Sequence, residues 1–350
     1  MQQLEEKNIS QVVINYTPKD FDSGEEPRWC PGCGDYAILN AVRSAFAELS
    51  KELGIPKEKF VIVSGIGCSS RFPYYMNTYG MHGIHGRAPA IATGVKVANP
   101  DLSVWVVTGD GDGLAIGGNH LIHAMRRNID IKILLFDNRI YGLTKGQYSP
   151  TSVMGQITKS SPYGVIERPV DPVMLALSQG TTFIARAIDR DIKRLTEIII
   201  EAGKHKGTAF IQIYQNCVVF NDKAFDDFAG KEVRSERVIE LKHGKPLLFG
   251  KNLDKGIIIE NGRPKVVKIG ENGITEDKIT VYDETDFYLN FVIATMHYPD
   301  FPEPIGIIRR VKVPTFEELL YNQIEHAKKL KGEGNLQKLI DKNSWEILPS

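Results

Sequence analysis

The sequence lacks an excess of charge of either sign. Its 350 residues contain 43 lysines and arginines and 43 aspartates and glutamates, so the formal net charge at pH 7 is zero. A chain with no net basic field has little to attract a phosphate backbone or an anionic lipid surface. We therefore expect no nucleic-acid partner and no membrane partner.

Long apolar runs and abundant cysteine are also missing. No stretch approaches the roughly 20 apolar residues needed to span a bilayer, and the first 21 residues contain no apolar region typical of a secretory signal. We expect a cytoplasmic location. The four cysteines are too few to suggest a disulfide framework in a reducing compartment, and are better interpreted as metal ligands or buried apolar residues.

Five short runs along the chain are rich in β-branched residues and almost continuously apolar. Such runs are typical of parallel strands buried on both faces. Helical stretches alternate with them, as in βαβ units. We predict an α/β fold, a doubly wound and mostly parallel sheet with helices on both faces. The predicted strands are 60–64, 104–108, 131–136, 182–187 and 209–215, and the predicted helices are 35–53, 90–98, 119–127 and 191–203.

No repeat or linker divides the chain, but its composition changes after about residue 220, where charged residues become more frequent. We therefore expect an N-terminal extension (1–28), a cofactor-binding domain (29–225) and a C-terminal appendage (226–350) that contacts other subunits. Within the appendage, Asn261-Gly262 predicts a hairpin turn. Thr315 and Glu318 predict a capping box that opens a helix. We expect the apolar stripe of this helix to pack on the protein's own core, and a partner surface is the alternative.

The segment after the second predicted strand begins GDGDG. Gly109, Gly111 and Gly113 allow close backbone approach at a strand end, where exposed amides can cradle an anion. Asp110 ends one strand and Asn138 the next, so their oxygens can converge at one edge of the sheet, and oxygen ligands beside phosphates are what Mg²⁺ takes. Taken alone, GDGDG could also be a flexible turn.

The four cysteines also follow strand ends. Cys30 and Cys33 form a C-x₂-C pair, while Cys68 and Cys217 each follow a predicted strand, so all four thiols can gather at the edge that carries the GDGDG segment. Three interpretations stay open: a [4Fe–4S] cluster, structural zinc, or unligated buried cysteines. The cluster is favoured because zinc more often uses two C-x₂-C pairs.

The ordered motifs WCPGCG, SGIGCSSR, HGIHGRAPAIATG, TGDGD and DNRIYGLTKGQYSPTS cover about residues 29–217. GDG, 26 further residues and Asn138 resemble the diphosphate-binding motif of thiamine-diphosphate (TPP) enzymes. The whole arrangement is similar to the β subunits of 2-oxoacid:ferredoxin oxidoreductases, particularly the 2-oxoglutarate type. The resemblance implies CoA-dependent oxidative decarboxylation of 2-oxoglutarate to succinyl-CoA, with electrons passing through a [4Fe–4S] cluster to ferredoxin.

The resemblance also assigns residues. Asp110 and Asn138 would bind Mg²⁺ by side chain and Ile140 by its carbonyl. Cluster ligands would be Cys30, Cys33, Cys68 and Cys217. The residues implied to meet the cofactors are Ile66, Gly67, Cys68, Ser69, His85, Gly109, Asp110, Gly111, Asp112, Asn138, Gly142, Leu143 and Thr144.

Three further side chains are implied to act in catalysis. His85 would contact the diphosphate or the substrate, Arg71 could clamp a distal substrate carboxylate, and Lys145 could attract the anionic parts of CoA. The competing interpretations are a structural histidine, a surface ion pair and a solvated lysine.

The resemblance implies a partner as well. The glutamate that activates the aminopyrimidine ring of TPP has no counterpart here, so an α subunit should supply it in an αβ or (αβ)₂ heteromer. A pyruvate or broad 2-oxoacid specificity, a non-oxidative TPP decarboxylase or carboligase, and a metal-binding scaffold stay as alternatives.

Overall fold

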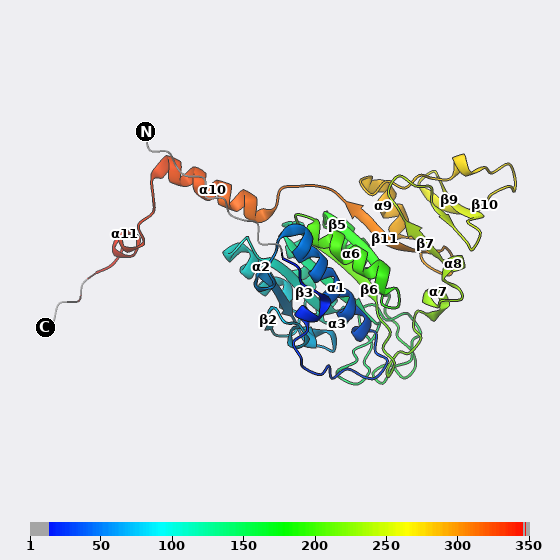
Figure 1. The fold of residues 1–350 in the computed structure, drawn as a ribbon, viewed down its shortest axis with the longest axis horizontal. Helices are drawn as coiled ribbons and strands as arrows, with labels where there is room; N and C mark the ends of the chain where they lie inside the picture. Colours follow the sequence, from blue (N-terminus) through cyan, green and yellow to red (C-terminus); the bar gives the residue numbers. More distant parts are fainter. Residues whose placement is uncertain (1–13, 346, 348–350) are drawn as a thin grey trace.

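The computed structural model describes residues 14–345 and 347 (Figure 1). These residues form an eight-stranded main sheet with the order β2-β1-β3-β4-β6-β5-β11-β7. All neighbours are parallel except β11, which is antiparallel to β5 and parallel to β7. The strands are β1 (Phe60–Ser64), β2 (Tyr79–His82), β3 (Ser103–Gly109), β4 (Ile131–Asp137), β5 (Phe183–Ile188), β6 (Ala209–Tyr214), β7 (Val238–Leu241) and β11 (Glu303–Arg310).

Helices cover both faces of this sheet, which confirms the predicted fold class. The two largest hydrophobic clusters lie on opposite faces of the sheet. Alternate residues of β1 point into different clusters, Phe60 and Ile62 into one and Val61 and Val63 into the other. Burial on both faces explains why the strands read as continuous apolar runs. The first cluster includes α1 (Asp35–Leu53) and α6 (Ile192–Lys204), and the second includes α2 (Ala88–Ala98), α4 (Gly118–Arg126), α5 (Pro172–Ser178) and α9 (Phe287–Ala294).

The carboxyl ends of β1, β3, β4 and β6 meet at one edge, the loop-rich lower edge in Figure 1. The short helix α3 (Asp110–Leu114) begins there directly after β3. The 3₁₀ helix η3 (Ser69–Tyr75) begins five residues after β1 ends. The five consecutive crossovers that join β1 to β6 thus bring loops that are far apart in sequence to the same place, as expected for an open α/β sheet.

The region beyond residue 225 only partly forms an appendage. Its strands β7 and β11 extend the main sheet, whereas β8 (Leu248–Phe249), β9 (Lys255–Glu260) and β10 (Arg263–Lys268) form a separate three-stranded sheet. The predicted hairpin joins β9 to β10, with φ of 53° at Asn261 and 74° at Gly262, the left-handed conformations of a type I′ turn. Two short helices, α7 (Asp226–Ala229) and α8 (Arg234–Arg237), precede β7.

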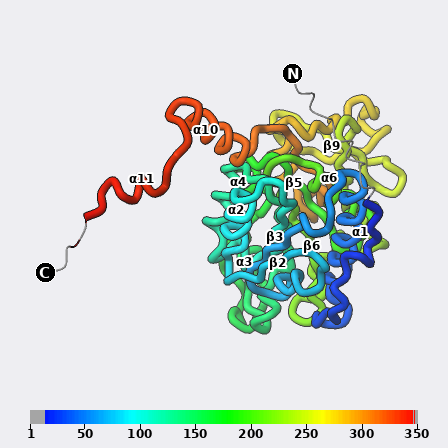
Figure 2. Tube along the Cα trace, turned by 60° about the vertical axis from the view of Figure 1, so that its left-hand side comes forward, coloured from blue at the N-terminus to red at the C-terminus, as the bar shows by residue number. Residues whose placement is uncertain are grey.

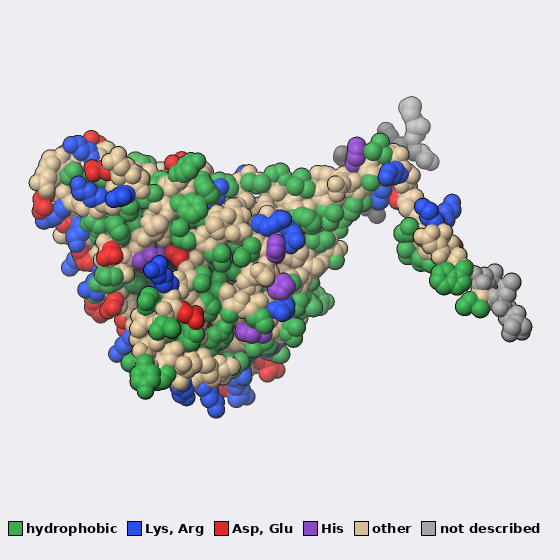
Figure 3. All heavy atoms as spheres, turned by 180° about the vertical axis from the view of Figure 1, so that it is seen from behind, with side chains coloured by type: hydrophobic (Ala, Val, Ile, Leu, Met, Phe, Trp, Pro, Cys, Tyr) green, Lys and Arg blue, Asp and Glu red, His purple; other side chains and the backbone are tan. Residues whose placement is uncertain are grey.

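The last helices leave the body of the molecule. Thr315 and Glu318 form the predicted capping box at the start of α10 (Phe316–Lys331). The expectation that its apolar stripe packs on the core is wrong: of the residues of α10 only Glu317 is buried, and Leu319 is 58% exposed. Figures 1 and 2 show α10 and α11 (Leu336–Asp341) extending as an arm, and Figure 3 shows the same arm from behind. The first two turns of α10 are hydrogen-bonded to the body, where Glu317 accepts from the Asp130 amide and the Tyr321 hydroxyl donates to the Val97 carbonyl. No helix among the described residues is long and apolar enough to cross a membrane.

A buried charge cluster closes the amino edge of the sheet, opposite the loop-rich edge. The Asp130 carboxylate pairs with Lys132 Nζ at 2.5 Å and with Lys96 Nζ at 2.8 Å. Lys132 Nζ also donates to the carbonyl oxygens of His205 and Gly207. Burial alone would raise the pKa of Asp130, but the two lysines more than offset it and hold that pKa well below its usual value. Charges buried here are therefore paired.

Candidate active site

A cavity of about 560 Å³ opens at the loop-rich edge. The loops after β1, β3, β4 and β6 line it, and every residue that the sequence implied to meet the cofactors lies around it. Ile140, the implied carbonyl ligand, lines it too, as do Asp35, Phe136, Tyr141, Gln147 and Gln215, which the sequence analysis did not assign. We refer to this space as the cofactor cavity.

Asp110 is one of three buried acidic groups that line the cofactor cavity, with 2% exposure. Its Oδ2 accepts hydrogen bonds of 2.6 Å from the hydroxyls of Ser149 and Thr151, and its Oδ1 accepts one from the Gly111 amide. No lysine or arginine pairs with it among the described residues. Burial, together with the nearby Asp137, raises its pKa to about 7. A bound divalent cation would supply the missing positive charge, so the residue fits a magnesium ligand.

Asp112 lines the cofactor cavity and is hydrogen-bonded by several of the protein's own donors. Its Oδ1 accepts hydrogen bonds from the amides of Ile66 and Gly86 and lies 2.7 Å from His85 Nδ1, while its Oδ2 accepts from Thr108. Because protein donors already occupy this carboxylate, Asp112 orients its neighbours. Its contact with Nδ1 leaves Nε2 of the partly exposed His85 as the ring nitrogen available to a ligand in the cavity.

Two glycines make room for these contacts. A Cβ at Gly65 would lie 2.0 Å from Asp112 Oδ2, and a Cβ at Gly111 would lie 2.2 Å from the Tyr141 ring, whose hydroxyl donates to the Gly111 carbonyl. Any side chain at either position would displace a wall of the cavity. The space beside the GDGD turn therefore depends on glycine, as a close-fitting diphosphate site requires.

A second cavity, of about 230 Å³, lies beside the first and is lined by all four cysteines. We refer to it as the cysteine cavity. The Gly34 amide donates to the Asn216 carbonyl, which joins the C-x₂-C loop to the loop of Cys217. Trp29 Nε1 donates to the Cys68 carbonyl at 2.7 Å, which joins the same loop to the end of β1. The fold thus gathers the thiols as the sequence implied.

The environment of the thiols differs from one to the next. Cys30 is exposed, whereas Cys33, Cys68 and Cys217 are partly buried. Burial raises the pKa of Cys68 to about 12 and that of Cys33 further. Thiolates at these buried positions would need a positive centre close by. The sulfurs surround a cavity, and the described residues contain no group of three or more potential ligands arranged around one metal ion.

Arg71 and Lys145 both line the cysteine cavity, together with Arg28. Neither lines the cofactor cavity, although Lys145 directly follows Thr144, which does. His85 is therefore the one of the three implied catalytic side chains that the fold places in the cofactor cavity itself. The three cations face a cavity whose lining includes a single carboxylate, Asp35.

Asp35 and Gln215 line both cavities and so form part of the wall between them. Asp35 is 1% exposed, and neither of its carboxylate oxygens has a hydrogen-bond partner among the residues that the structure describes. Burial raises its pKa to about 7. The sequence could have suggested it only through its place two residues after Cys33, because its burial depends on α1 docking against the sheet.

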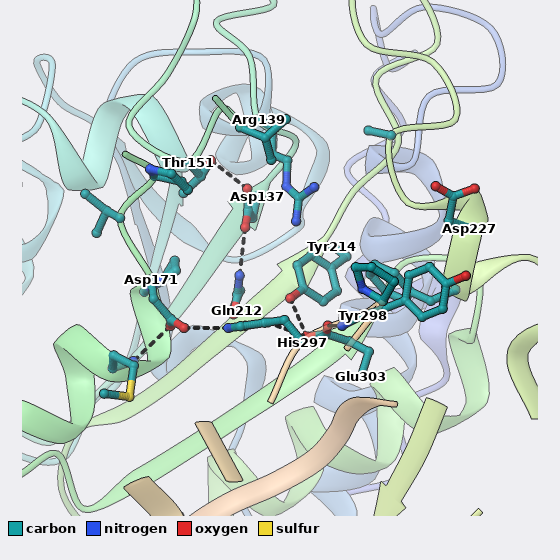
Figure 4. Close-up of a pocket in the computed structure, with 18 of the residues that line it drawn as sticks. Asp137, Arg139, Thr151, Asp171, Gln212, Tyr214, Asp227, His297, Tyr298 and Glu303 are labelled. Atoms are coloured by element: carbon teal, nitrogen blue, oxygen red, sulfur yellow. Dashed lines mark hydrogen bonds and ion pairs between the residues drawn. The ribbon is translucent and has the colours of Figure 1, made fainter. Parts of the chain in front are cut away.

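A third and larger cavity, of about 970 Å³, lies beyond the end of β4 (Figure 4). Its polar lining residues are hydrogen-bonded to one another: Gln212 donates to Asp137, Tyr214 donates to Glu303, and His297 lies 2.9 Å from Asp171. Thr151 connects it to the cofactor cavity, because its hydroxyl contacts both Asp110 and Asp137. The implied site residues lie outside this third cavity.

Comparisons with known proteins agree with this geometry. The family model described as "Thiamine pyrophosphate enzyme, C-terminal TPP binding domain" matches residues 65–213. A 2-oxoglutarate oxidoreductase subunit KorB of Mycobacterium tuberculosis is 48% identical over 335 residues, which cover 94% of this chain and 88% of that protein. A 2-oxoacid:ferredoxin oxidoreductase subunit β of Sulfolobus is 50% identical over 196 residues, 55% of this chain and 63% of that protein.

A solved structure extends the likeness to the whole fold. The 2-oxoglutarate:ferredoxin oxidoreductase from Magnetococcus marinus, with 2-oxoglutarate, coenzyme A and succinyl-CoA bound, matches with a TM-score of 0.74 and 34% identity, over 95% of this chain and 98% of that one. The fold and site define the class as a thiamine-diphosphate enzyme domain. Within that class, the near full-length relatives show that the chain belongs to the family of 2-oxoacid:ferredoxin oxidoreductase β subunits.

Proposed function

We propose that this chain is the β subunit of a 2-oxoglutarate:ferredoxin oxidoreductase. The reaction converts 2-oxoglutarate, CoA and two oxidised ferredoxins into succinyl-CoA, CO₂, a proton and two reduced ferredoxins. The observation that carries the proposal is the shared wall between the cofactor cavity and the cysteine cavity. TPP in one cavity and a one-electron carrier, the cluster, in the other would lie on opposite sides of this wall. Such an arrangement suits an oxidation in single-electron steps.

In the cofactor cavity the chain would bind magnesium and TPP. TPP supplies a carbon nucleophile that holds the electrons released when CO₂ leaves. Asp110 and Asn138 would hold Mg²⁺ by side chain and Ile140 by its carbonyl, while the glycine-lined turn admits the diphosphate. His85, fixed by Asp112, would present Nε2 to the diphosphate or the substrate. The GDGD turn and the Gly142–Thr144 turn would enclose the cofactor from two sides.

In the cysteine cavity Cys30, Cys33, Cys68 and Cys217 would hold one [4Fe–4S] cluster. Four sulfurs spread around a cavity suit a cluster better than a single zinc ion, which draws its ligands to one point. Lys145 would attract the anionic parts of CoA, and Arg71 would pair with the distal carboxylate of 2-oxoglutarate. Both cations line the cysteine cavity, so each must reach its ligand along the shared wall.

The remaining proposals concern partners. An α subunit would supply the glutamate that activates TPP and would complete an αβ or (αβ)₂ heteromer, and ferredoxin would accept the electrons. Pyruvate or broad 2-oxoacid specificity is the alternative for the substrate, and a non-oxidative TPP decarboxylase the alternative for the reaction. The cytoplasmic location stays a prediction.

The test is electron paramagnetic resonance (EPR) on the anaerobically purified complex, before and after addition of 2-oxoglutarate and CoA. A radical or reduced-cluster signal that appears only with substrate is the expected result. If dithionite produces the cluster signal and 2-oxoglutarate does not, the assigned substrate is wrong. If neither produces a signal, the cluster is absent and the non-oxidative alternative takes its place.

A further inference from the structure

A buried glutamine touches residues of both cavities. Gln215 directly follows β6, is 1% exposed and lines the cofactor cavity as well as the cysteine cavity. Its Oε1 accepts a hydrogen bond of 2.8 Å from Asn138 Nδ2. Its Nε2 lies 3.3 Å from Cys33 Sγ and 2.6 Å from the Asn216 carbonyl oxygen. One side-chain amide therefore contacts a proposed magnesium ligand and a proposed cluster ligand.

The contact with Asn138 fixes the orientation of that amide. An asparagine side chain carries its acceptor oxygen and its donor nitrogen on different sides. Because Nδ2 is bound to Gln215, Oδ1, the only side-chain atom of Asn138 that can ligate a cation, is held on the other side, where it accepts from the Ile140 amide at 3.1 Å. Gln215 thereby selects the rotamer in which oxygen is available for magnesium.

The contact with Cys33 would stabilise negative charge on the cluster sulfur. An N–H group that donates to a cluster sulfur stabilises the more negative, reduced state and raises the reduction potential. The donor is well anchored, because the Gln215 backbone amide donates to the Asp137 carbonyl at 2.9 Å and continues the pairing of β4 with β6. A shift of Asn138 would therefore be passed to Nε2 through one rigid amide group.

We propose that Gln215 is a positioning residue shared by the two cofactor sites: its carbonyl oxygen orients Asn138 for magnesium, its amide nitrogen donates to Cys33, and occupancy of the magnesium–TPP site therefore sets the reduction potential of the cluster. This inference rests on the proposed function, since it requires both groups. Coupling of this kind is reciprocal, so reduction of the cluster also changes the affinity for magnesium and TPP.

The experiment measures the cluster's midpoint potential by EPR-monitored redox titration of the whole complex, with magnesium and TPP bound and after their removal by a chelator and dialysis. In the wild type, the midpoint potential with magnesium and TPP bound should differ from the potential without them. A difference of about 59 mV corresponds to a tenfold change in the ratio of reduced to oxidised cluster at one applied potential. Gln215→Met keeps the length of the side chain and removes both hydrogen bonds. Its potential is lower than the wild type's and no longer depends on magnesium and TPP.

A second variant separates the two contacts. Gln215→Glu keeps an acceptor for Asn138 and loses the donor to Cys33, so calorimetry should show wild-type affinity for TPP and magnesium while the potential falls. In Gln215→Met the same affinity should fall about tenfold. The matched control is Gln212→Met, a buried glutamine on β6, the strand that Gln215 follows. Among the described residues, the Gln212 side chain bonds to Arg186 and Asp137 and to no cysteine. Its cluster potential should equal that of the wild type.

Iron and sulfide analysis of the wild type comes first: without a cluster, the proposed function fails before Gln215 is tested. If the cluster is present, unchanged potentials in the wild type with and without magnesium and TPP overturn the inference, as does a wild-type potential in folded Gln215→Met. Should both variants misfold, ¹⁵N labelling of glutamine side chains in the wild type decides. Pulsed EPR must then show coupling of the reduced cluster to an amide nitrogen, and its absence removes the proposed hydrogen bond.

Discussion

At the amino edge of the main sheet, Asp130 is shared between Lys96 and Lys132. At the carboxyl edge, among the residues that the structure describes, Asp35 has no hydrogen-bond partner and Asp110 is bound by hydroxyl and amide groups alone. Both edges bury carboxylates to a similar depth, but the pKa of Asp130 is lowered while burial raises the pKa values of Asp35 and Asp110. The amino edge supplies its own countercharge, whereas the described residues supply none to Asp35 and Asp110 at the carboxyl edge.

The difference separates stability from function within one sheet. Disrupting a buried ion pair lowers stability because removal of one partner leaves the other charge buried and uncompensated. A buried charge without a partner lowers the stability of the empty protein and strengthens the binding of whatever neutralises it. Substitutions at the two edges should therefore have opposite consequences, and the predictions below test this contrast.

The largest effect on folding is expected at the amino edge. Asp130→Ala leaves Lys96 and Lys132 buried without a countercharge, so the free energy of unfolding should fall by about 3–5 kcal/mol. Urea denaturation of the isolated chain measures this free energy. The control is Asp101→Ala, a substitution of an exposed aspartate that should change the free energy of unfolding by less than about 0.5 kcal/mol. Equal stability of the two variants would show that the cluster is not a stabilising element.

At the carboxyl edge the expected loss is in binding. Asp110→Ala should weaken magnesium-dependent binding of TPP by at least about 100-fold, or roughly 2.7 kcal/mol, since it removes the buried oxygen ligand. The apo protein should be no less stable than the wild type, because an uncompensated buried carboxylate is gone. Calorimetry and thermal unfolding measure the two quantities on the same sample. A large fall in the apo melting temperature would contradict the contrast between the edges.

A smaller effect concerns pH. Burial lowers the pKa of His205, at the amino edge, to about 4, compared with about 6.5 when unfolded. The unfolded state thus binds more protons between these values, and stability is lost as the pH falls from about 6.5 towards 4. Between pH 7 and 4.5 the loss should be about 2 kcal/mol. In His205→Gln, the fall in the free energy of unfolding between pH 7 and 4.5 should be smaller by this amount. If the fall equals that of the wild type, another group is responsible for the pH dependence.

The smallest effect is expected outside both edges. Truncation after Lys331 removes α11 and everything beyond it, and none of the described residues in that stretch is buried. The free energy of unfolding of the chain should change by less than about 0.5 kcal/mol. A loss of several kcal/mol in denaturant titration would show that the arm folds back on the body in solution.

The sequence was a good guide where local pattern decides the structure. Continuous apolar runs predicted five strands to within a residue or two, and Asn261-Gly262 predicted a turn because few residue pairs adopt left-handed conformations so easily. It was a poor guide where distant segments decide. The strand β2 has four exposed residues and no continuous apolar run, and β11 is defined by its insertion between β5 and β7.

The site shows the same division. The family resemblance assigned the residues around the cofactor cavity, through motifs that follow the strand ends. Asp35 and Gln215 were missed, since their importance comes from lying between two cavities, a relation that no spacing in the sequence expresses. The solvent exposure of α10 was missed for a related reason: an apolar stripe indicates that a helix has a face to cover, and says nothing of what covers it.

The position of β11 also affects the order in which the chain can fold during synthesis. Strand β7 pairs only with β11 in the main sheet, yet more than 60 residues separate the two along the chain, including the β9–β10 hairpin. The segment from β1 to β6 can assemble as soon as it leaves the ribosome, while β7 must wait until residues 303–310 emerge. For that interval the outer side of β5 is an open edge, and an unpaired strand edge can pair with another chain.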